Sequence, residues 1–350
     1  MELVELDLAD HEQAEHYWRV RETALSAGRP RYQPTRLEDF LELLALPDET
    51  YRRRVIAVSA QHSMMGAAVE LTPTDVQSQD VWVFPFVPPH YRGEGIGRML
   101  IEELIRHAQD AERTRMLSAV EFAGDNLAEA SRHPYVHFAR SHGFEIGRRL
   151  IRWELTLPVD PSIRASFDQA AYPRLEGYRL AIFEGLPPPQ WRDMLWALHA
   201  VSDDHDMARE LAVQPDRTSS DPETTATMWL GQGHAILTAI AVGPQDDLVG
   251  LCTVRIPPKP ESAAILQGAT YVDEAHRRRR LAPMLLLALS TWIDTHAPQR
   301  KHLHNTTVEI DRKMASLSRA LGYRPIETML RVSRRIVKEI PPEEESASQS

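Results

Sequence analysis

The sequence predicts a mixed fold of the α/β (α+β) class that is used twice in tandem, each copy a mostly antiparallel, splayed sheet flanked by helices. Two spacings predict the duplication. The stretches RGEGIG from Arg92 and RRRRLA from Arg277 lie 185 residues apart, and an amphipathic helix pattern follows each. The pairs Gly143–Phe144 and Gly322–Tyr323 lie 179 residues apart. Because glycine suits the position just after a helix, both pairs mark a helix end. One fold used twice explains both spacings.

Each copy shows the same order of predicted elements: a strand, two helices, three strands, the helix after the loop, a strand, a short helix and two closing strands. In the first copy these patterns fall at 3–7, 10–27, 35–46, 53–60, 64–71, 81–87, 96–108, 115–122, 137–142 and 148–157, the last range covering the closing strands. In the second copy they fall at 178–183, 188–199, 222–231, 234–242, 248–256, 264–272, 281–292, 301–308, 316–321 and 327–337, the last range again covering the closing strands.

Composition shifts suggest the domain boundaries. We expect the first domain at residues 1–157 and the second at 178–340, because residues 158–177 are rich in proline and polar side chains and read as a linker. Residues 341–350, PPEEESASQS, read as a disordered acidic tail.

Composition and charge exclude several classes of protein. The 350 residues are 43% hydrophobic and 26% charged, as in ordinary globular proteins. No apolar run approaches the roughly 20 residues that span a bilayer, and the acidic N-terminus does not resemble a secretory signal. The single cysteine, Cys252, excludes a disulfide within the chain. We therefore expect a cytoplasmic protein with no membrane partner, and the oligomeric state stays open. The net charge of −10 argues against nucleic acid and suggests a modest bias toward cationic substrates.

The stretch RGEGIG, between a strand and a helix, is typical of a phosphate-binding loop. Glycines let the backbone turn tightly, and successive N–H groups then converge on an anion at the start of the helix. A dinucleotide-binding fingerprint is the obvious rival, and Glu121 lies roughly where its acidic residue would be. However, three strands precede the loop, and strands and helices do not go on alternating. Pro85 interrupts the strand before the loop, which predicts a bulge that splays this strand from its neighbour and opens a slot.

At these residues the chain resembles the GNAT N-acetyltransferases, whose loop motif is matched by Arg92, Gly95 and Gly97. The Gly-aromatic pairs are also family features, and the duplication resembles the tandem GNAT proteins common in actinomycetes, which include mycothiol synthase. The resemblance implies acetyl-CoA, or another acyl-CoA, as co-substrate, with its pyrophosphate on the loop and its pantetheine arm along residues 83–87. It implies these cofactor-binding candidates: Phe86, Val87, Arg92, Gly93, Glu94, Gly95, Ile96, Gly97, Arg98 and Asn126.

The family's usual general acid is missing from both copies. Many members carry a tyrosine four residues before the glycine of the Gly-aromatic pair, and Ala139 and Ser318 stand there instead. Other proton donors near the first of these positions are Tyr135, His137 and Ser141. For the base that takes a proton from the amine, the candidates are Glu121 and Glu70, or a water relay.

The second loop departs from the motif. Arginine replaces glycine at Arg278 and Arg280, where positive φ would be costly, and Pro283 lacks an N–H group. A further family pattern of two asparagines and a methionine falls on Thr307, Asp311 and Met314, so both asparagines are replaced. We therefore expect an intact acyl-CoA loop in the first domain and a degraded loop that binds acetyl-CoA weakly or not at all in the second. The candidate second site comprises Val272, Arg277, Arg278, Arg279, Arg280, Leu281 and Ala282.

The resemblance favours an acetyl-CoA-dependent N-acetyltransferase acting on a small-molecule amine. One alternative is a non-catalytic CoA-binding or scaffold protein, which would fit Ala139 and the degraded second loop. Another is a related transferase that uses a longer acyl-CoA or an aminoacyl-tRNA as donor; the arginine run would suit tRNA, but the net charge speaks against it. A metal site is not expected, because the histidines lack a partner set with ligand spacing.

Overall fold

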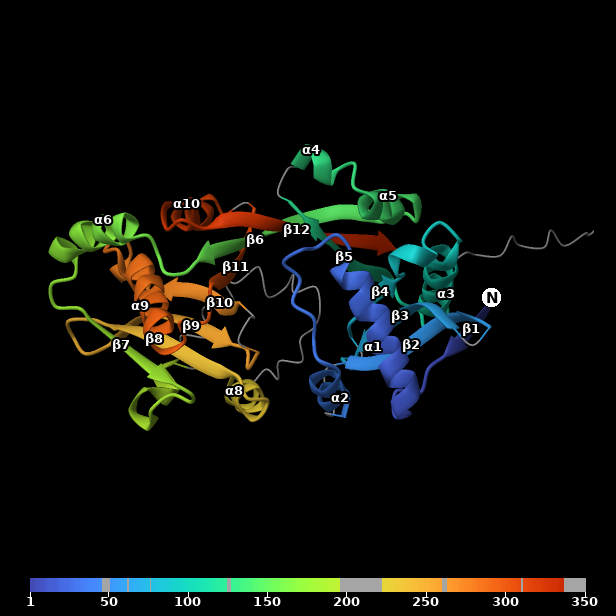
Figure 1. Cartoon of the computed structure of the whole chain (residues 1–350), viewed down its shortest axis with the longest axis horizontal. Helices are drawn as coiled ribbons and strands as arrows, with labels where there is room; N and C mark the ends of the chain where they lie inside the picture. The colour runs from blue at the N-terminus through green and yellow to red at the C-terminus, as the bar shows by residue number, and fades with distance from the viewer. Residues whose placement is uncertain are drawn as a thin grey trace, which may run out of the picture.

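A single twelve-stranded sheet runs through the molecule in the order β1-β2-β3-β4-β5-β12-β6-β11-β10-β9-β8-β7 (Figure 1). The computed structural model describes residues 1–45, 51–61, 63–75, 77–124, 127–195, 222–259, 263–309 and 311–336. Neighbouring strands pair antiparallel, except for β4 with β5 and β10 with β11, which are parallel. The predicted fold class is confirmed: the structure is a mixed, mostly antiparallel sheet flanked by helices.

The N-terminal half contains β1 (Glu2–Glu5), α1 (His11–Ser26), α2 (Leu37–Ala45), β2 (Tyr51–Ala60), β3 (Ser63–Pro73), β4 (Asp80–Phe86), η1 (Pro89–Tyr91), α3 (Ile96–Asp110), β5 (Arg115–Ala123), α4 (Leu127–Ala130), α5 (Pro134–Ser141) and β6 (Glu145–Thr156). Its sheet is covered on both faces. Helix α3 packs on one face through residues such as Leu100 and Leu104, and α1 and α2 pack on the other through Tyr17 and Phe40.

The C-terminal half contains α6 (Pro161–Ala171), η2 (Tyr172–Arg174), β7 (Arg179–Glu184), a helical segment at 189–195, α8 (Pro222–Gly231), β8 (Ala235–Val242), β9 (Leu248–Ile256), β10 (Ala264–Val272), η4 (Glu274–His276), α9 (Leu281–His296), β11 (His302–Val308), α10 (Arg312–Ala320) and β12 (Arg324–Arg335). Helix α9 packs on one face, with Leu285 and Leu289 fully buried. Leu195 and Trp191 pack on the other face.

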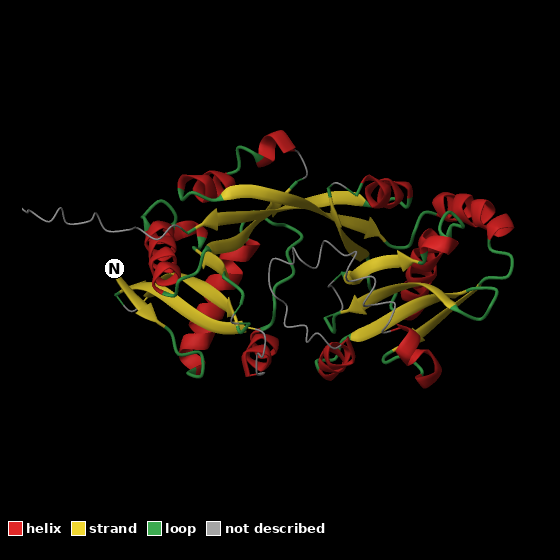
Figure 2. Ribbon diagram, turned by 180° about the vertical axis from the view of Figure 1, so that it is seen from behind, coloured by secondary structure: helices red, strands yellow, loops and turns green. Residues whose placement is uncertain are grey.

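The two halves exchange their closing strands. Strand β6 of the N-terminal half pairs with β11, and β12, at the end of the described chain, inserts between β5 and β6. Figure 2 shows the closing strands as the long ribbons that bridge the two ends of the molecule. The domain boundaries at 157 and 178 were placed along the sequence and remain a prediction. In the sheet, each half is completed by a strand of the other half.

Three local expectations need correction. Each half closes with one long strand, β6 or β12, where two had been expected. The expected linker at 158–177 contains α6, whose Phe167 is buried in the C-terminal core. The bulge expected at Pro85 is absent, because β3 and β4 stay in register with Ala68 opposite Pro85. The expected tail at 341–350 lies outside the described residues.

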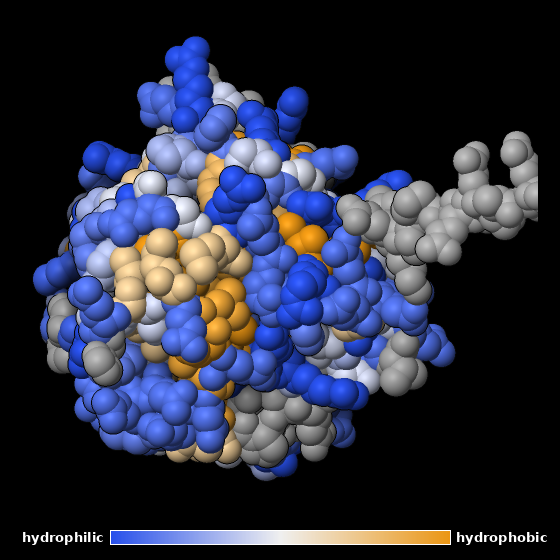
Figure 3. All heavy atoms as spheres, turned by 90° about the vertical axis from the view of Figure 1, so that its right-hand side faces the viewer, coloured by the Kyte–Doolittle hydropathy of each residue, from blue (hydrophilic) through white to orange (hydrophobic). Residues whose placement is uncertain are grey.

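The end of the molecule that carries β1 and α3 shows an ordinary protein surface. Figure 3 shows this face covered mostly by hydrophilic side chains, with a narrow apolar strip between them. Some apolar area of this kind is a normal part of the surface of globular proteins. The large cavity of the molecule lies between the two halves, as described next.

Candidate active site

The predicted phosphate loop has the backbone shape that an anion site needs. Gly93 and Gly95 have φ of 85° and 84°, and α3 starts at the next residue, Ile96. The first N–H group that bonds within the helix is that of Met99, which donates to the Gly95 carbonyl oxygen. The N–H groups before it therefore have no partner within the helix and are open at its N-terminus. Arg92 donates from Nε to the Val87 carbonyl oxygen at 2.9 Å, which fixes the loop against the end of β4.

Close packing also fixes the first turn of α3. A Cβ atom added at Gly97 would lie 3.2 Å from the Phe138 ring of α5, whereas one added at Gly95 would meet nothing within 4 Å. Gly97 therefore lets α3 approach α5, and Gly95 supplies the left-handed turn. The residues present fit a bound pyrophosphate, because the loop presents N–H groups at a helix N-terminus.

A slot between β4 and β5 starts beside this loop. The two strands pair only from Asp80 to Trp82, opposite Arg115 to Leu117. Beyond that point Phe84, Phe86 and Val87 on one side, and residues 118–122 on the other, line a common cavity. The predicted splay is therefore present, although it arises from divergence of β4 and β5 and not from a bulge at Pro85. Where β4 and β5 no longer pair with each other, their backbone N–H and C=O groups are available to pair with an extended ligand.

The slot opens into a cavity of about 1450 Å³ between the two halves. The N-terminal half contributes the loop, the slot and the segment between α1 and α2, and the C-terminal half contributes side chains of α8, β9 and β11, among them Trp229, Arg255 and His304. A ligand pocket for a molecule of drug size measures about 300–1,000 Å³, so this cavity has room for two ligands side by side.

The two candidate bases lie on opposite faces of the sheet. Glu121 on β5 lines the cavity. Glu70 on β3 does not, because neighbouring residues of a strand face opposite ways: Val69 and Leu71 line the cavity, and Glu70 points to the α3 side. The structure therefore brings Glu121 to the slot and places Glu70 away from it.

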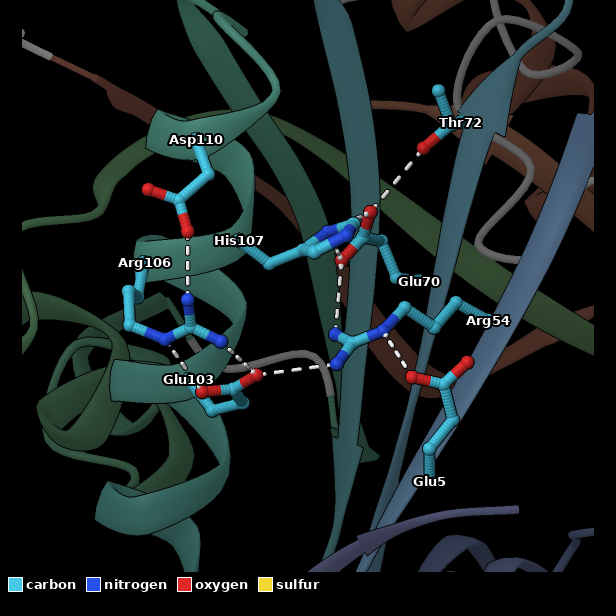
Figure 4. Close-up of polar contacts among 8 residues, drawn as sticks. All are labelled: Glu5, Arg54, Glu70, Thr72, Glu103, Arg106, His107 and Asp110. Atoms are coloured by element: carbon cyan, nitrogen blue, oxygen red, sulfur yellow. Dashed lines mark hydrogen bonds and ion pairs between the residues drawn. The ribbon is translucent and has the colours of Figure 1, made fainter.

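Glu70 belongs to a structural network with α3 (Figure 4). Its carboxylate lies 2.9 Å from His107 Nδ1, accepts a hydrogen bond from the Thr72 hydroxyl at 3.3 Å, and lies 3.8 Å from Arg54. Arg54 in turn bonds Glu5 and Glu103. Glu70 is only 2% exposed, and such an enclosed set of contacts positions α3 on the sheet.

Glu121 belongs to a second network that joins the two ends of the chain. Arg29 contacts Glu121 through Nη2 and binds Glu327 of β12 in a fork, with distances of 3.0 and 2.9 Å. Arg152 of β6 adds a contact to Glu327 at 2.6 Å. Burial alone would raise the pKa of Glu327, but the hydrogen bond from Arg29 and the charges of Arg152 and Arg29 hold it below its usual value.

His304 of β11 is a buried histidine that also lines the cavity. His304 Nε2 is 3.1 Å from a Glu154 carboxylate oxygen, and Nδ1 is 3.4 Å from the Gln33 side-chain nitrogen. Burial lowers the pKa of His304, although the hydrogen bond to Glu154 opposes this. The imidazole is therefore neutral at pH 7. We assign its proton to Nε2, facing Glu154.

Of the three alternative proton donors, Tyr135 lines the cavity, and His137 and Ser141 do not. The Arg92 guanidinium lies 5.0 Å from the centre of the Tyr135 ring, so Tyr135 stands beside the phosphate loop. Ala139, at the position of the family's usual acid, also lines the cavity. Asn126 lies outside the described residues.

The second loop has kept the backbone shape of the first. Arg278 and Arg280 both have φ of 67°, α9 follows at Leu281, and Arg277 Nε donates to the Val272 carbonyl oxygen at 3.1 Å, as Arg92 does to Val87. The arginines thus adopt the left-handed conformation, at a cost of roughly 1–2 kcal/mol each. The expectation that positive φ is costly for arginine stands, and the chain adopts this turn in spite of the cost.

The second loop differs in its surroundings. Its residues line neither the large cavity nor the next one, of about 670 Å³, beside α6. Tyr178 lies against it, with its hydroxyl 2.8 Å from His276 Nδ1 and its ring 5.5 Å from the Arg279 guanidinium. Ser318 is buried and also lines neither cavity. Weak acetyl-CoA binding in this half remains a prediction.

Sequence reasoning missed the partners of Glu121. Arg29 and Glu327 are 298 residues apart, and neither stands in a motif. A weak signal was available: glutamate at 327 opens the predicted closing strand, next to the apolar residues Met329 and Leu330, and a charge that becomes buried in such a place needs a partner.

Comparison with known families agrees with the geometry. Residues 15–144 match the family model described as the acetyltransferase (GNAT) family. The chain carries a GNAT acetyltransferase domain. The match runs from within α1 to the Gly143–Phe144 pair and includes the intact loop, the slot and Glu121.

Solved structures extend the GNAT fold to the whole chain. A tandem GNAT protein from the clavulanic acid biosynthesis pathway, determined without AcCoA, is 20% identical, with 96% of this chain and 98% of that chain covered and a TM-score of 0.74. A GCN5-related N-acetyltransferase from Sphaerobacter thermophilus is 16% identical, with 96% and 95% covered and a TM-score of 0.63. The curated proteins include no significant match. At these identities the likeness shows the fold, and this chain has the tandem GNAT architecture.

Two further properties concern the described residues of this protein. No helix among them is long and apolar enough to cross a bilayer. They also include no group of three or more histidine, cysteine, aspartate or glutamate side chains that is placed to hold a metal ion.

Proposed function

We propose that the protein is an acetyl-CoA-dependent N-acetyltransferase that acts on a small-molecule amine and holds its co-substrate mainly in the N-terminal half. One observation carries the proposal: the intact glycine loop at the start of α3 continues into the β4–β5 slot, and the slot opens into the cavity between the halves. A co-substrate with phosphates at one end and an extended arm fits that path. The cavity leaves room for the acceptor beside it.

When bound, acetyl-CoA supplies an acetyl group activated as a thioester. Glu121 is the carboxylate placed to take the proton that the amine loses, because it lines the cavity beside the slot. Arg29 fixes the orientation of this carboxylate. Tyr135 is the hydroxyl placed to give a proton to the thiolate that leaves.

Binding and turnover test the proposal separately. Calorimetry with acetyl-CoA measures whether the loop is used, and release of free thiol across a panel of amines measures transfer. Absence of binding at millimolar acetyl-CoA would overturn the proposal. Binding without thiol release from any amine would favour a CoA-binding scaffold.

The two glutamates make a matched pair for testing the base. Glu121→Gln is expected to lower kcat about 10²–10⁴-fold, the usual contribution of general acid–base catalysis, with little change in the Kd for acetyl-CoA. Glu70→Gln, the same change on the other face of the sheet, is expected to leave kcat within a few fold. Equal loss of kcat in both variants would rule out the assignment of Glu121.

A further inference from the structure

Cationic side chains outnumber carboxylates on the wall of the cavity, although the chain is acidic and some of these arginines pair with carboxylates behind the wall. The described wall carries ten arginine or lysine side chains and two carboxylates, Asp39 and Glu121. Both carboxylates are already held by arginines: Arg36 Nε donates to Asp39 at 2.9 Å, and Arg29 contacts Glu121. A cationic acceptor such as a polyamine would therefore find no uncommitted carboxylate on the described wall. The balance of charge on this wall is thus opposite in sign to the net charge of the chain, which is −10.

One group of donors lies on the C-terminal wall, opposite the half that carries the phosphate loop. Arg255 of β9 lies over the Trp229 ring of α8, with its guanidinium carbon 3.8 Å from the ring centre. Its Nη1 is 3.2 Å from His234 Nδ1. Lys259 and the Gln232 side chain line the same side of the cavity. We call Trp229, His234 and Arg255 the β9 corner.

The electrostatics of the β9 corner favour an anion. Burial, and then the charge of Arg255, lower the pKa of His234 to about 4, so the ring is neutral and Nδ1 accepts from Arg255. Nε2 is then a donor. A guanidinium held by stacking on an aromatic ring loses little entropy when it binds a planar anion. Arginine also pairs with carboxylate or phosphate through two parallel hydrogen bonds.

The β9 corner is separate from the cations that would serve the co-substrate. Arg92 and Arg98 belong to the phosphate loop and the first turn of α3, in the N-terminal half. Strand β9 and helix α8 lie in the other half, across the middle of the molecule (Figure 1). A second ligand that spans the cavity can thus place one end at the slot and the other at the β9 corner.

We propose that the β9 corner binds an acidic group of the acceptor, so that the amine acetylated by this protein also carries a carboxylate or a phosphate. This inference rests on the proposed N-acetyltransferase function. The amine would lie at the slot in the N-terminal half, and the acidic group would lie on the C-terminal half. The second GNAT copy would then serve to recognise the substrate.

The test compares matched amines with and without an acidic group. Amino acids are paired with their amides, and an aminoalkyl phosphate is paired with its amino alcohol, so that the two arms separate a carboxylate from a phosphate. We expect thiol release to favour the acidic member of at least one pair by tenfold or more in kcat/KM. Arg255→Gln is expected to raise KM for that amine about 10–100-fold, as loss of a charged hydrogen bond of about 1.5–3 kcal/mol predicts. KM for acetyl-CoA should stay within twofold.

Two variants guard this test against misfolding. Lys259→Gln changes an exposed side chain of the same wall and should raise KM for the acidic amine to a lesser degree. Arg179→Gln removes an exposed arginine of β7 that pairs with Asp246 outside the cavity, and it should change neither KM. Thermal unfolding of each variant shows whether the fold is intact.

The possible outcomes distinguish failure of the inference, that the β9 corner binds an acidic group, from failure of the proposed N-acetyltransferase function. Turnover that is equal or faster with the amides and amino alcohols, or equal effects of Arg255→Gln on both members of a pair, would overturn the inference and leave the transferase standing. If no amine releases thiol, the proposed function fails. Calorimetric binding of the acidic amines to wild type and Arg255→Gln then decides the inference, and equal affinity overturns it.

Discussion

Gly95→Val is expected to raise the Kd for acetyl-CoA about a hundredfold. Gly95 has φ of 84°, which a β-branched residue adopts only with strain of the order of 1–3 kcal/mol. Relief of that strain would turn the N–H groups of the next residues away from the phosphates, and each hydrogen bond to a charged group contributes about 1.5–3 kcal/mol. A loss near 3 kcal/mol corresponds to about a hundredfold in Kd. Calorimetry measures it directly.

The second copy refines this prediction. Arg280 adopts the conformation that Gly95 has, with φ of 67°, and a Cβ at Gly95 would meet nothing within 4 Å. Gly95→Arg should therefore keep more of the loop shape than Gly95→Val and weaken binding less. Gly185→Val is the matched control, since Gly185 has φ of 80° and open space around it but lies outside the cavity. It should lose stability without loss of affinity. Wild-type affinity in Gly95→Val would mean that the phosphates bind elsewhere.

Local sequence patterns predicted most of the fold. The loop, the helix after it and the hairpins all fall within a few residues of their predicted places, because each depends on hydrophobic periodicity and on glycines that the chain displays locally. The duplication was readable for the same reason, since two spacings agreed. The slot was also predicted, although by the wrong mechanism: proline at 85 accommodates the register with β3.

Strand exchange could not be predicted in this way. The apolar patterns of the two closing strands do not say which half each one completes, because the choice depends on contacts between residues far apart in sequence. Register is set by burial across the whole sheet. Glu327 illustrates this, because its partners are Arg29 and Arg152, in other parts of the chain. The shape of the second loop could not be predicted for a related reason: residue preference gives the cost of positive φ at Arg278 and Arg280, but not whether the rest of the fold imposes that conformation.

Glu327→Ala is expected to lower the free energy of unfolding by about 3–5 kcal/mol, the cost of removing one partner from a buried ion pair. Glu327 is 1% exposed and accepts from both Arg29 and Arg152. Its removal leaves the buried guanidinium of Arg29 with Glu121 as the carboxylate in contact with it, and takes a partner from the partly buried Arg152. It also loosens the tie between β12 and the N-terminal half, so denaturant unfolding should show a lower midpoint. A separate early transition of one half would show that Glu327 couples the two.

The contribution of Glu327 to the free energy of unfolding should decrease as the pH falls. The folded-state pKa of Glu327 lies below its unfolded value of about 4.5, so the unfolded chain binds the proton more readily than the folded one. The contribution of Glu327 is therefore complete above pH 4.5 and is lost as the pH falls through the lower folded-state value. Glu327→Gln keeps the shape without the charge, and the stability gap between it and wild type should narrow as the pH falls below 4.5. A gap that stays constant down to pH 3 would mean that packing, and not charge, accounts for the role of Glu327 in joining the two halves.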